Sequence, residues 1–238
     1  MCNRVRRTSR KKLQELFGDV LVTETERPPE ELTTGFDRPM MPVLTSYPEV
    51  ALEEMEWGFL PREAGGNPGL QGKLGILLNA RAETVLEKFA FRNAIRQHRC
   101  IIPIEGFYEH MHSMEGKKKV KTPYYISLDT GLMFVAGVWD VCDGRKTFAM
   151  ITTAANPLMA NIHNTKERQP HLLDQDEWAQ WLDPALSDTE LKAMLSNIYP
   201  DSHMQAALYE VPGVGKKEKV QKVKEERPPA APQQPTLF

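Results

Sequence analysis

The chain has 238 residues, of which 41% are apolar and 26% are charged, and its formal net charge is −2. This balance is typical of a globular protein with a sizeable core, so it argues against a wholly disordered chain. Neither an apolar leader after the basic N-terminus nor a run of about 18 apolar residues occurs, so we expect a cytoplasmic protein without membrane contact. We also expect a monomer.

The first third of the chain alternates between helical and extended patterns. Leu13, Leu16 and Phe17 recur at helical spacing and Gly18 follows them, which predicts a short basic helix over residues 8–17. Further along, the pattern predicts an extended segment at 40–44, a strand at 56–61, a glycine-rich loop at 63–73 and a strand at 74–79.

The middle and the end of the chain are rich in short strands. Thr84 opens a predicted helix over residues 84–97, with Val85 and Phe89 among its inward side chains. Strands are predicted at 100–108, 124–128, 132–140, 146–153 and 209–212, and helices at 174–181 and 187–198. Because strands follow one another with few helices between them, the sequence predicts an α+β fold with an antiparallel, barrel-like core and peripheral helices.

The composition changes near residue 213. Lysines alternate with glutamates there and give way to proline, alanine and glutamine, a mixture that cannot bury enough apolar surface to fold. We therefore expect one catalytic domain over residues 1–212 and a disordered, basic and proline-rich tail over residues 213–238.

The cysteines are few and widely spaced. Cys2, Cys100 and Cys142 do not make a disulfide framework, and no pair of them has the short spacing of a zinc site. This favours a reducing compartment, and we expect neither a metal nor another cofactor.

Cys2 has a chemical property that the other cysteines lack. If Met1 is removed, the chain begins with a thiol and an α-amine on adjacent carbons. An α-amine has a pKa of about 7.7 to 8.0, so a useful fraction is neutral at physiological pH. It can attack an aldehyde, and the thiol can then close a five-membered ring on the imine carbon.

Three more polar residues stand where predicted strands or loops end. Asn79 follows an apolar strand, Glu109 follows Phe107 and Tyr108, and His163 lies in a loop. A carboxyl group held against aromatic rings and a histidine are both suited to proton transfer. Each residue also has an ordinary structural interpretation, as a strand end, an exposed acid or a loop histidine.

Together with Cys2, these residues belong to a set of ordered motifs that resembles the SRAP (SOS-response-associated peptidase) family. The matching pieces are Met1-Cys2 with Arg4, Trp-Gly-Phe-Leu-Pro at 57–61, Asn-Ala-Arg-Ala-Glu at 79–83, Arg-Cys-Ile-Ile-Pro at 99–103, Gly-Phe-Tyr-Glu at 106–109, Phe-Val-Ala-Gly-Val-Trp at 134–139, Ile-Thr-Thr-Ala-Ala-Asn at 151–156 and Ile-His at 162–163. They occur in the family's order and cover residues 1 to about 212. Asn3 departs from the family, which usually has glycine there.

The resemblance implies an enzyme that senses abasic sites in single-stranded or junction DNA. In this family the N-terminal cysteine forms a thiazolidine with the ring-opened sugar, which leaves a DNA–protein crosslink. Carried over by position, Glu109 is the acid and base, His163 polarises the sugar oxygen, and Asn79 holds the N-terminal residue. Arg4 and Arg81 would contact phosphates beside the lesion.

Two alternatives remain open at this point. In the first, the chain is a thiol peptidase, or autopeptidase, in which Cys2 attacks a peptide carbonyl with help from His163 and Glu109. In the second, it is a non-catalytic adaptor for DNA and the sliding clamp. The adaptor hypothesis draws on the chain's last five residues, because Gln234, Leu237 and Phe238 resemble a short clamp-binding peptide behind a flexible linker.

Overall fold

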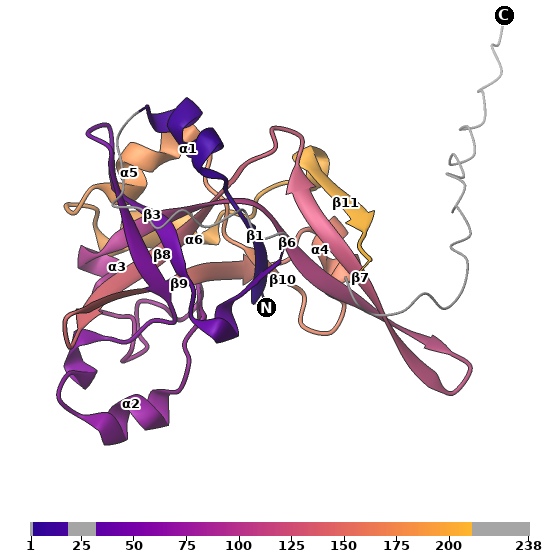
Figure 1. The fold of residues 1–238 in the computed structure, drawn as a ribbon, viewed down its shortest axis with the longest axis horizontal. Coiled ribbons are helices and arrows are strands. Elements are labelled where there is room, and N and C mark those ends of the chain that lie inside the picture. Colours follow the sequence, from indigo (N-terminus) through magenta and orange to yellow (C-terminus); the bar gives the residue numbers. More distant parts are fainter. Residues whose placement is uncertain (1, 19–31, 211–238) are drawn as a thin grey trace, which may run out of the picture.

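A closed barrel of five strands forms the centre of the computed structural model, which describes residues 2–18 and 32–210 (Figure 1). The strands are β3 (Met40–Ser46), β4 (Ala51–Trp57), β6 (Arg99–Glu115), β8 (Met133–Cys142) and β9 (Arg145–Ala154). They pair in the order β9, β4, β3, β6, β8 and back to β9. Four pairings are antiparallel and the β4–β9 pairing is parallel. The α+β class and the barrel-like core are thus confirmed. The core that we expected to be antiparallel contains one parallel pairing, and β5 (Asn79–Arg81) adds a second parallel pairing to β9 outside the barrel.

The remaining strands extend the barrel wall. β1 (Arg4–Arg7) lies between β6 and β2 (Thr33–Thr34), and β7 (Lys118–Leu128) lies between β6 and β11 (Met204–Leu208). β5 (Asn79–Arg81) and β10 (Arg168–Pro170) both pair with β9. The hairpin of β6 and β7 projects from the body of the molecule (Figure 1). β11 covers Met204–Leu208, where its pairing with β7 runs, instead of beginning at residue 209. The end of the strand predicted at 209–212 lies outside the described residues.

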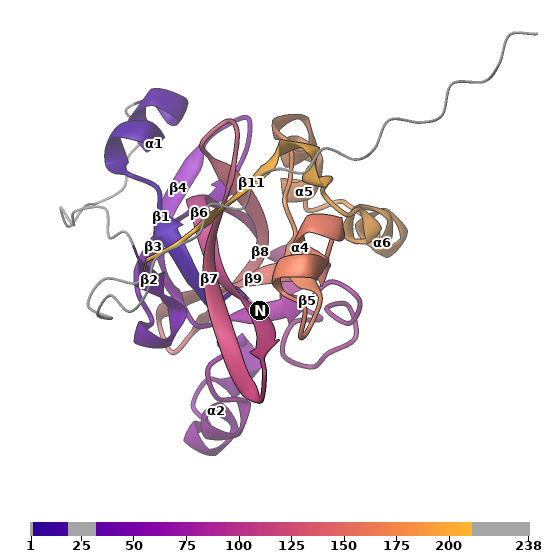
Figure 2. The same cartoon turned by 90° about the vertical axis from the view of Figure 1, so that its right-hand side faces the viewer.

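Short helices surround these strands. They are α1 (Arg10–Phe17), α2 (Pro68–Leu74), α3 (Ala94–Gln97), α4 (Pro157–Ile162), α5 (Trp178–Leu182) and α6 (Asp188–Ser196). In Figure 2, α1 lies on one side of the strands and α5 and α6 on the other. No helix within the described residues is long and apolar enough to cross a membrane.

The helix predicted over residues 8–17 is confirmed and begins at Arg10. The side chain of Ser9 accepts a hydrogen bond from the Lys12 backbone N–H, which caps the first turn. Gly18 ends the helix with φ of 72°, a conformation that glycine adopts without strain.

The helix predicted over residues 84–97 is wrong except for its last turn, α3. Residues 82–93 form separate turns, and the Lys88 and Arg92 N–H groups donate to carbonyls four residues earlier without a continuous helix between them. Val85 is fully buried, whereas Phe89, which we expected to face inward, is 44% exposed. Packing of individual apolar side chains against the barrel therefore overrides the helical pattern.

The loop predicted at 63–73 contains a helix. Asn67 caps α2 by accepting a hydrogen bond from the Leu70 N–H, and Pro68 occupies the first helical position, where its missing N–H has no consequence. The cap and the proline together specify a helix in spite of the glycines.

Two apolar clusters lie on opposite faces of the barrel wall. Along β6, Ile101 belongs to one cluster and Cys100 to the other, as expected from the alternation of side chains in a strand. The first cluster holds Trp178 and Trp181 of α5, and the second holds Trp57 stacked on Phe148 with ring centroids 6.3 Å apart.

A buried arginine joins the barrel to α5. Arg99 is 4% exposed and donates hydrogen bonds to the carbonyl oxygens of Trp181 and Ile95 at 2.6 and 2.7 Å. The Trp181 indole N–H donates in return to the Cys100 carbonyl at 2.9 Å. Because carbonyl acceptors satisfy the guanidinium, its burial does not leave an unpaired donor.

Gly106 marks the point at which β6 changes its neighbours. Before it, β6 pairs with β8, and after it with β7, while β1 pairs on the other side. A side chain at residue 106 would press against the carbonyl oxygen of Ile126 and lie 2.6 Å from the Tyr125 ring. The close approach of β7 therefore depends on glycine here.

We predict that Gly106→Ala lowers the free energy of unfolding by about 1–3 kcal/mol, because the added methyl group overpacks the strand corner. Gly72→Ala is the matched control. Gly72 lies in α2 with no atom within 4 Å of the new methyl group, so this change should be neutral or slightly stabilising. Urea denaturation of both variants measures the effect, and equal midpoints would contradict it.

Candidate functional site

Residue 2 lies in the core because β1 holds the beginning of the chain between two strands. Val5 stands opposite Phe107 of β6 and Thr33 of β2. The Asn3 carbonyl accepts a hydrogen bond from the Gly35 N–H at 2.9 Å. Cys2 is only 3% exposed and packs in the same apolar cluster as Met159 and Ile162 of α4. Figure 2 shows α4 close to the N-terminal end of the chain.

Glu109 and His163 face each other beside this chain end. Glu109 comes from β6, and His163 is the residue that ends α4. The His163 Nε2 and Glu109 Oε2 atoms are 3.8 Å apart, and the two side chains are 5% and 15% exposed. Two titratable groups from separate elements thus meet in a largely buried position.

A backbone contact fixes the proton arrangement of the His163 ring. Its Nδ1 lies 2.9 Å from the Arg168 carbonyl oxygen, which can only accept, so Nδ1 must carry a proton. In the neutral ring Nε2 therefore carries none. A hydrogen bond between Nε2 and Glu109 then needs one proton, held either by the carboxyl group or by the imidazolium.

Asn164 joins the segment after α4 to β6. Its Oδ1 accepts from the His112 N–H at 3.1 Å, and its Nδ2 donates to the His112 carbonyl at 2.8 Å. These two bonds occupy both backbone groups of one residue, as a neighbouring strand would. They keep His163 and Glu109 at a fixed separation. No local pattern in the sequence predicts this role, although Asn164 directly follows His163.

Asn79 touches the first residues of the chain. It opens β5, where it stands beside Met150 of β9, and its Nδ2 donates to the Asn3 Oδ1 at 2.9 Å. The Asn79 Oδ1 is buried and has no hydrogen-bond partner among the described residues. A buried, unsatisfied acceptor is unfavourable, so this oxygen is suited to receive a donor.

Burial changes the acidity of the two groups that would react. It raises the pKa of the Cys2 thiol well above its ordinary value, and the nearby Glu109 charge raises it further. Burial also lowers the pKa of His163, against the opposing effects of the Arg168 carbonyl and of Glu109. The thiol is therefore protonated near neutrality, and the imidazole favours its neutral form.

The structure thus brings Cys2, Glu109 and His163 together and connects Asn79 to them through Asn3. Arg4 and Arg81 lie nearby on the surface, two residues after Cys2 and Asn79 respectively. The clamp-binding residues predicted from the sequence, Gln234, Leu237 and Phe238, lie outside the described residues. Within the described ranges, no group of three His, Cys, Asp or Glu side chains is arranged to hold a metal ion.

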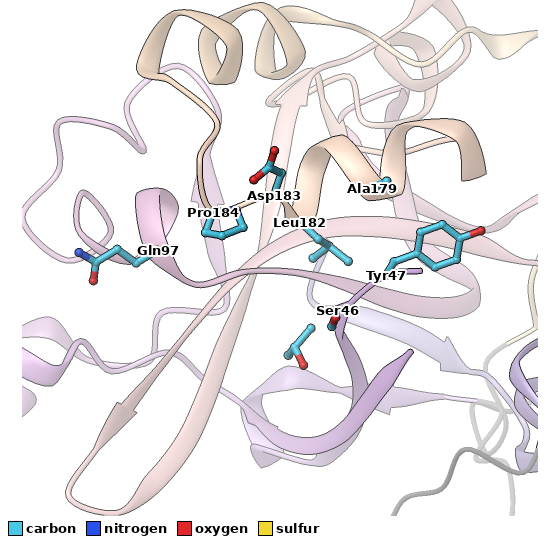
Figure 3. Close-up of a pocket in the computed structure, with 8 residues that line it drawn as sticks. Ser46, Tyr47, Gln97, Ala179, Leu182, Asp183 and Pro184 are labelled. Atoms are coloured by element: carbon cyan, nitrogen blue, oxygen red, sulfur yellow. The ribbon is translucent and has the colours of Figure 1, made fainter. Parts of the chain in front are cut away.

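An open hollow of about 480 Å³ lies elsewhere, between the end of β3, α3 and α5 (Figure 3). Ser46, Tyr47, Leu182 and Asp183 are among its lining residues. The Asp183 side chain accepts a hydrogen bond from the Ala185 N–H and serves the local turn. None of the site residues named above lines this hollow. The group formed by Cys2, Glu109 and His163 is therefore the better candidate for the functional site.

Comparison with known proteins shows the family of the chain. The family described as "SOS response associated peptidase (SRAP)" matches residues 1–214. The chain belongs to the SRAP family. This SRAP chain is 34% identical over 162 residues to "Abasic site processing protein YoqW" of Bacillus subtilis strain 168, a match covering 65% of the chain and 67% of the relative. It is equally similar to "Abasic site processing protein YoaM" of that strain, covering 65% and 66%.

Solved structures share the fold of this chain. A protein from Bacteroides thetaiotaomicron shares 31% of its sequence with this chain and superposes with a TM-score of 0.75, over 88% of this chain and 92% of that one. A phage-related protein from Bordetella bronchiseptica, 21% identical, superposes with a TM-score of 0.66 over 88% and 95% of the two chains and supports the fold alone.

We predict that Cys2 of the folded protein reacts with iodoacetamide at least about tenfold more slowly at neutral pH than in the unfolded protein. Its raised pKa leaves little thiolate, so the rate should keep rising with pH beyond about 8.5, the ordinary thiol midpoint. Peptide mapping separates Cys2 from Cys100 and Cys142, and concentrated urea provides the unfolded control. Rapid labelling with a midpoint at or below the ordinary value would contradict the prediction.

Proposed function

We propose that this SRAP protein processes abasic sites in DNA by forming a thiazolidine between Cys2 and the open-chain sugar. The observation that carries the proposal is the burial of Cys2 beside a histidine–carboxylate pair. Membership of the family and the printed names of the Bacillus relatives support abasic sites as the target. The proposal requires removal of Met1, which frees the Cys2 amine.

The reaction proceeds in two bond-forming steps. The Cys2 nitrogen bonds to C1 of the sugar aldehyde, and the aldehyde oxygen, after gaining protons, leaves as water to give an imine. The thiol sulfur then bonds to the same carbon as the C=N bond becomes single, and the thiol proton passes to nitrogen. The product is a five-membered ring, and one water is released overall. Ring closure gains the advantage of an intramolecular reaction.

Glu109 and His163 supply the proton transfers. With Nδ1 donating to the Arg168 carbonyl, His163 can give or take a proton only at Nε2, the atom that faces Glu109. The pair can thus deliver one proton to the departing oxygen and accept one from the attacking group. In this proposal the unsatisfied Asn79 Oδ1 accepts a hydrogen bond from the Cys2 amine and orients it. The hydrogen bond from the Asn79 Nδ2 to the neighbouring Asn3 side chain supports this role.

The acidity of Cys2 favours attack by the amine over attack by the thiol. A thiol peptidase needs a thiolate, which the raised pKa of Cys2 disfavours. An imine can instead form first and meet the protonated thiol afterwards. We therefore place the peptidase second, and the DNA and clamp adaptor, which does not use Cys2, third.

Arg4 and Arg81 would hold the phosphates beside the lesion, giving salt-sensitive binding with little dependence on base sequence. Single-stranded DNA or a junction suits the site, because a sugar in an intact duplex cannot reach a buried chain end. Binding to a sliding clamp through Gln234, Leu237 and Phe238, a monomeric state and a domain boundary near residue 212 remain proposals.

We predict that incubation with a single-stranded oligonucleotide carrying one abasic site converts the protein to an adduct that survives denaturation. Intact-mass analysis should show an adduct of protein plus DNA minus one water, and only for molecules that have lost Met1. Cys2→Ala should form no such adduct.

Cys2→Ser is the matched control for ring closure. It keeps the α-amine but replaces sulfur with a weaker nucleophile, so its imine should accumulate only when trapped by borohydride. If Cys2→Ala forms the same adduct, or if Met1 stays in place on the adduct, the aldehyde-trapping proposal fails. Unchanged DNA binding without any adduct would favour the adaptor.

A further inference from the structure

A small pocket of about 190 Å³ lies next to the beginning of β1, formed by β1, β2, β6, β7 and the residue that follows β11. We call it the tyrosine pocket; its lining includes Arg4, Thr34, Tyr108, His110, Pro123 and Tyr209. Side chains alternate along β6, so Tyr108 and His110 lie on the opposite face of the strand from Glu109. The tyrosine pocket and the proposed active site thus share one strand.

Packed aromatic rings make its wall. Tyr108 is 6% exposed, and its ring centroid is 4.5 Å from that of Tyr209 and 5.0 Å from that of Tyr125. The Tyr125 hydroxyl donates to the Glu105 carbonyl at 2.9 Å, and the Tyr209 N–H donates to the Pro123 carbonyl at 3.0 Å. These contacts hold the ring surfaces in position before any ligand arrives, which favours flat, rigid ligands.

The tyrosine pocket carries positive charge on one side. Arg4 lines it, and no acidic side chain is among its described lining residues. Burial lowers the pKa of His110, and the charges of Arg4, Lys121 and His112 lower it further. The charge of Glu109, on the other face of the strand, opposes this by raising the pKa. A flat apolar group attached to an anion therefore matches this surface in both shape and charge.

We propose that the tyrosine pocket binds an unpaired base of single-stranded DNA, that of a nucleotide next to the abasic site, while Arg4 contacts the attached phosphate. The proposal deepens and rests on the proposed function. Arg4, the first residue of β1, follows Cys2 by two positions. Their Cα atoms are therefore at most about 7 Å apart, which is comparable to one nucleotide step of a stretched strand. Stacking on tyrosine is tolerant of base identity, because every base has a flat π face.

Binding can be measured without the crosslinking chemistry. The probe is a fluorescent single-stranded oligonucleotide in which a tetrahydrofuran residue, which has no aldehyde, replaces the abasic sugar. Fluorescence anisotropy should show about tenfold weaker binding for Tyr209→Leu, as expected for one lost base stack, whereas Tyr209→Phe should bind like the wild type. Leu208→Ala is the control, because Leu208 is 52% exposed and does not line the pocket.

The matching change in the DNA tests whether a base is the ligand. Replacing both nucleotides beside the lesion with tetrahydrofuran residues should weaken wild-type binding about as much as Tyr209→Leu does, and should weaken Tyr209→Leu little further. Independent, additive losses would overturn the proposal, as would equal binding by Tyr209→Leu and wild type.

The crosslinking assay separates this proposal from the proposed function. If wild type binds the probe through Tyr209 but forms no adduct with a true abasic site, the proposed chemistry fails and the tyrosine pocket stands. If the adduct forms and Tyr209→Leu binds normally, the chemistry stands and the pocket proposal is overturned. Absence of any binding to the probe overturns the pocket proposal whatever the chemistry.

Discussion

The pairing of β1 with β6 is the constraint on which the rest of the site depends. A chain terminus is ordinarily exposed and mobile, yet here Val5 pairs with Phe107 and Cys2 is almost completely buried. β6 also carries Glu109, two positions beyond Phe107. One ladder therefore sets the positions of both Cys2, the proposed nucleophile, and Glu109, its proposed acid–base partner. Gly106 makes this possible, because only glycine lets β7 approach β6 so closely at that corner.

The site residues do not share a secondary-structure element, and their separation depends on contacts between elements. Asn164 ties the segment after α4 to β6, and the Arg168 carbonyl orients the His163 ring. Preorganised groups of this kind can stabilise charge that develops during a reaction without having to move. Burial raises the pKa of the Cys2 thiol, so little thiolate forms near neutral pH. The α-amine is then the more suitable first nucleophile, which is the order of steps that we propose.

The sequence predicted the barrel and most of its strands, because alternation along a strand is a local signal. Its ordered motifs also named Cys2, Glu109 and His163, which the structure brings together and which remain proposed site residues. It did not predict the turns at 82–93, whose apolar spacing resembles a helix but whose Val85 and Phe91 are buried in the first apolar cluster without a continuous helix between them. It also did not predict the two hydrogen bonds that join Asn164 to the His112 backbone of β6. Hydrogen bonds of that kind join residues 52 positions apart, and no local pattern records them.

The thiazolidine would be visible in a crystal structure of the protein joined to a short single-stranded oligonucleotide at an abasic site. We expect a five-membered ring containing the nitrogen and sulfur of Cys2 and C1 of the sugar, with the Glu109 and His163 side chains beside it. The Asn79 Oδ1 should accept a hydrogen bond from the ring nitrogen. DNA attached through another residue, or an unmodified Cys2 with Met1 still in place, would show that the proposed chemistry is wrong.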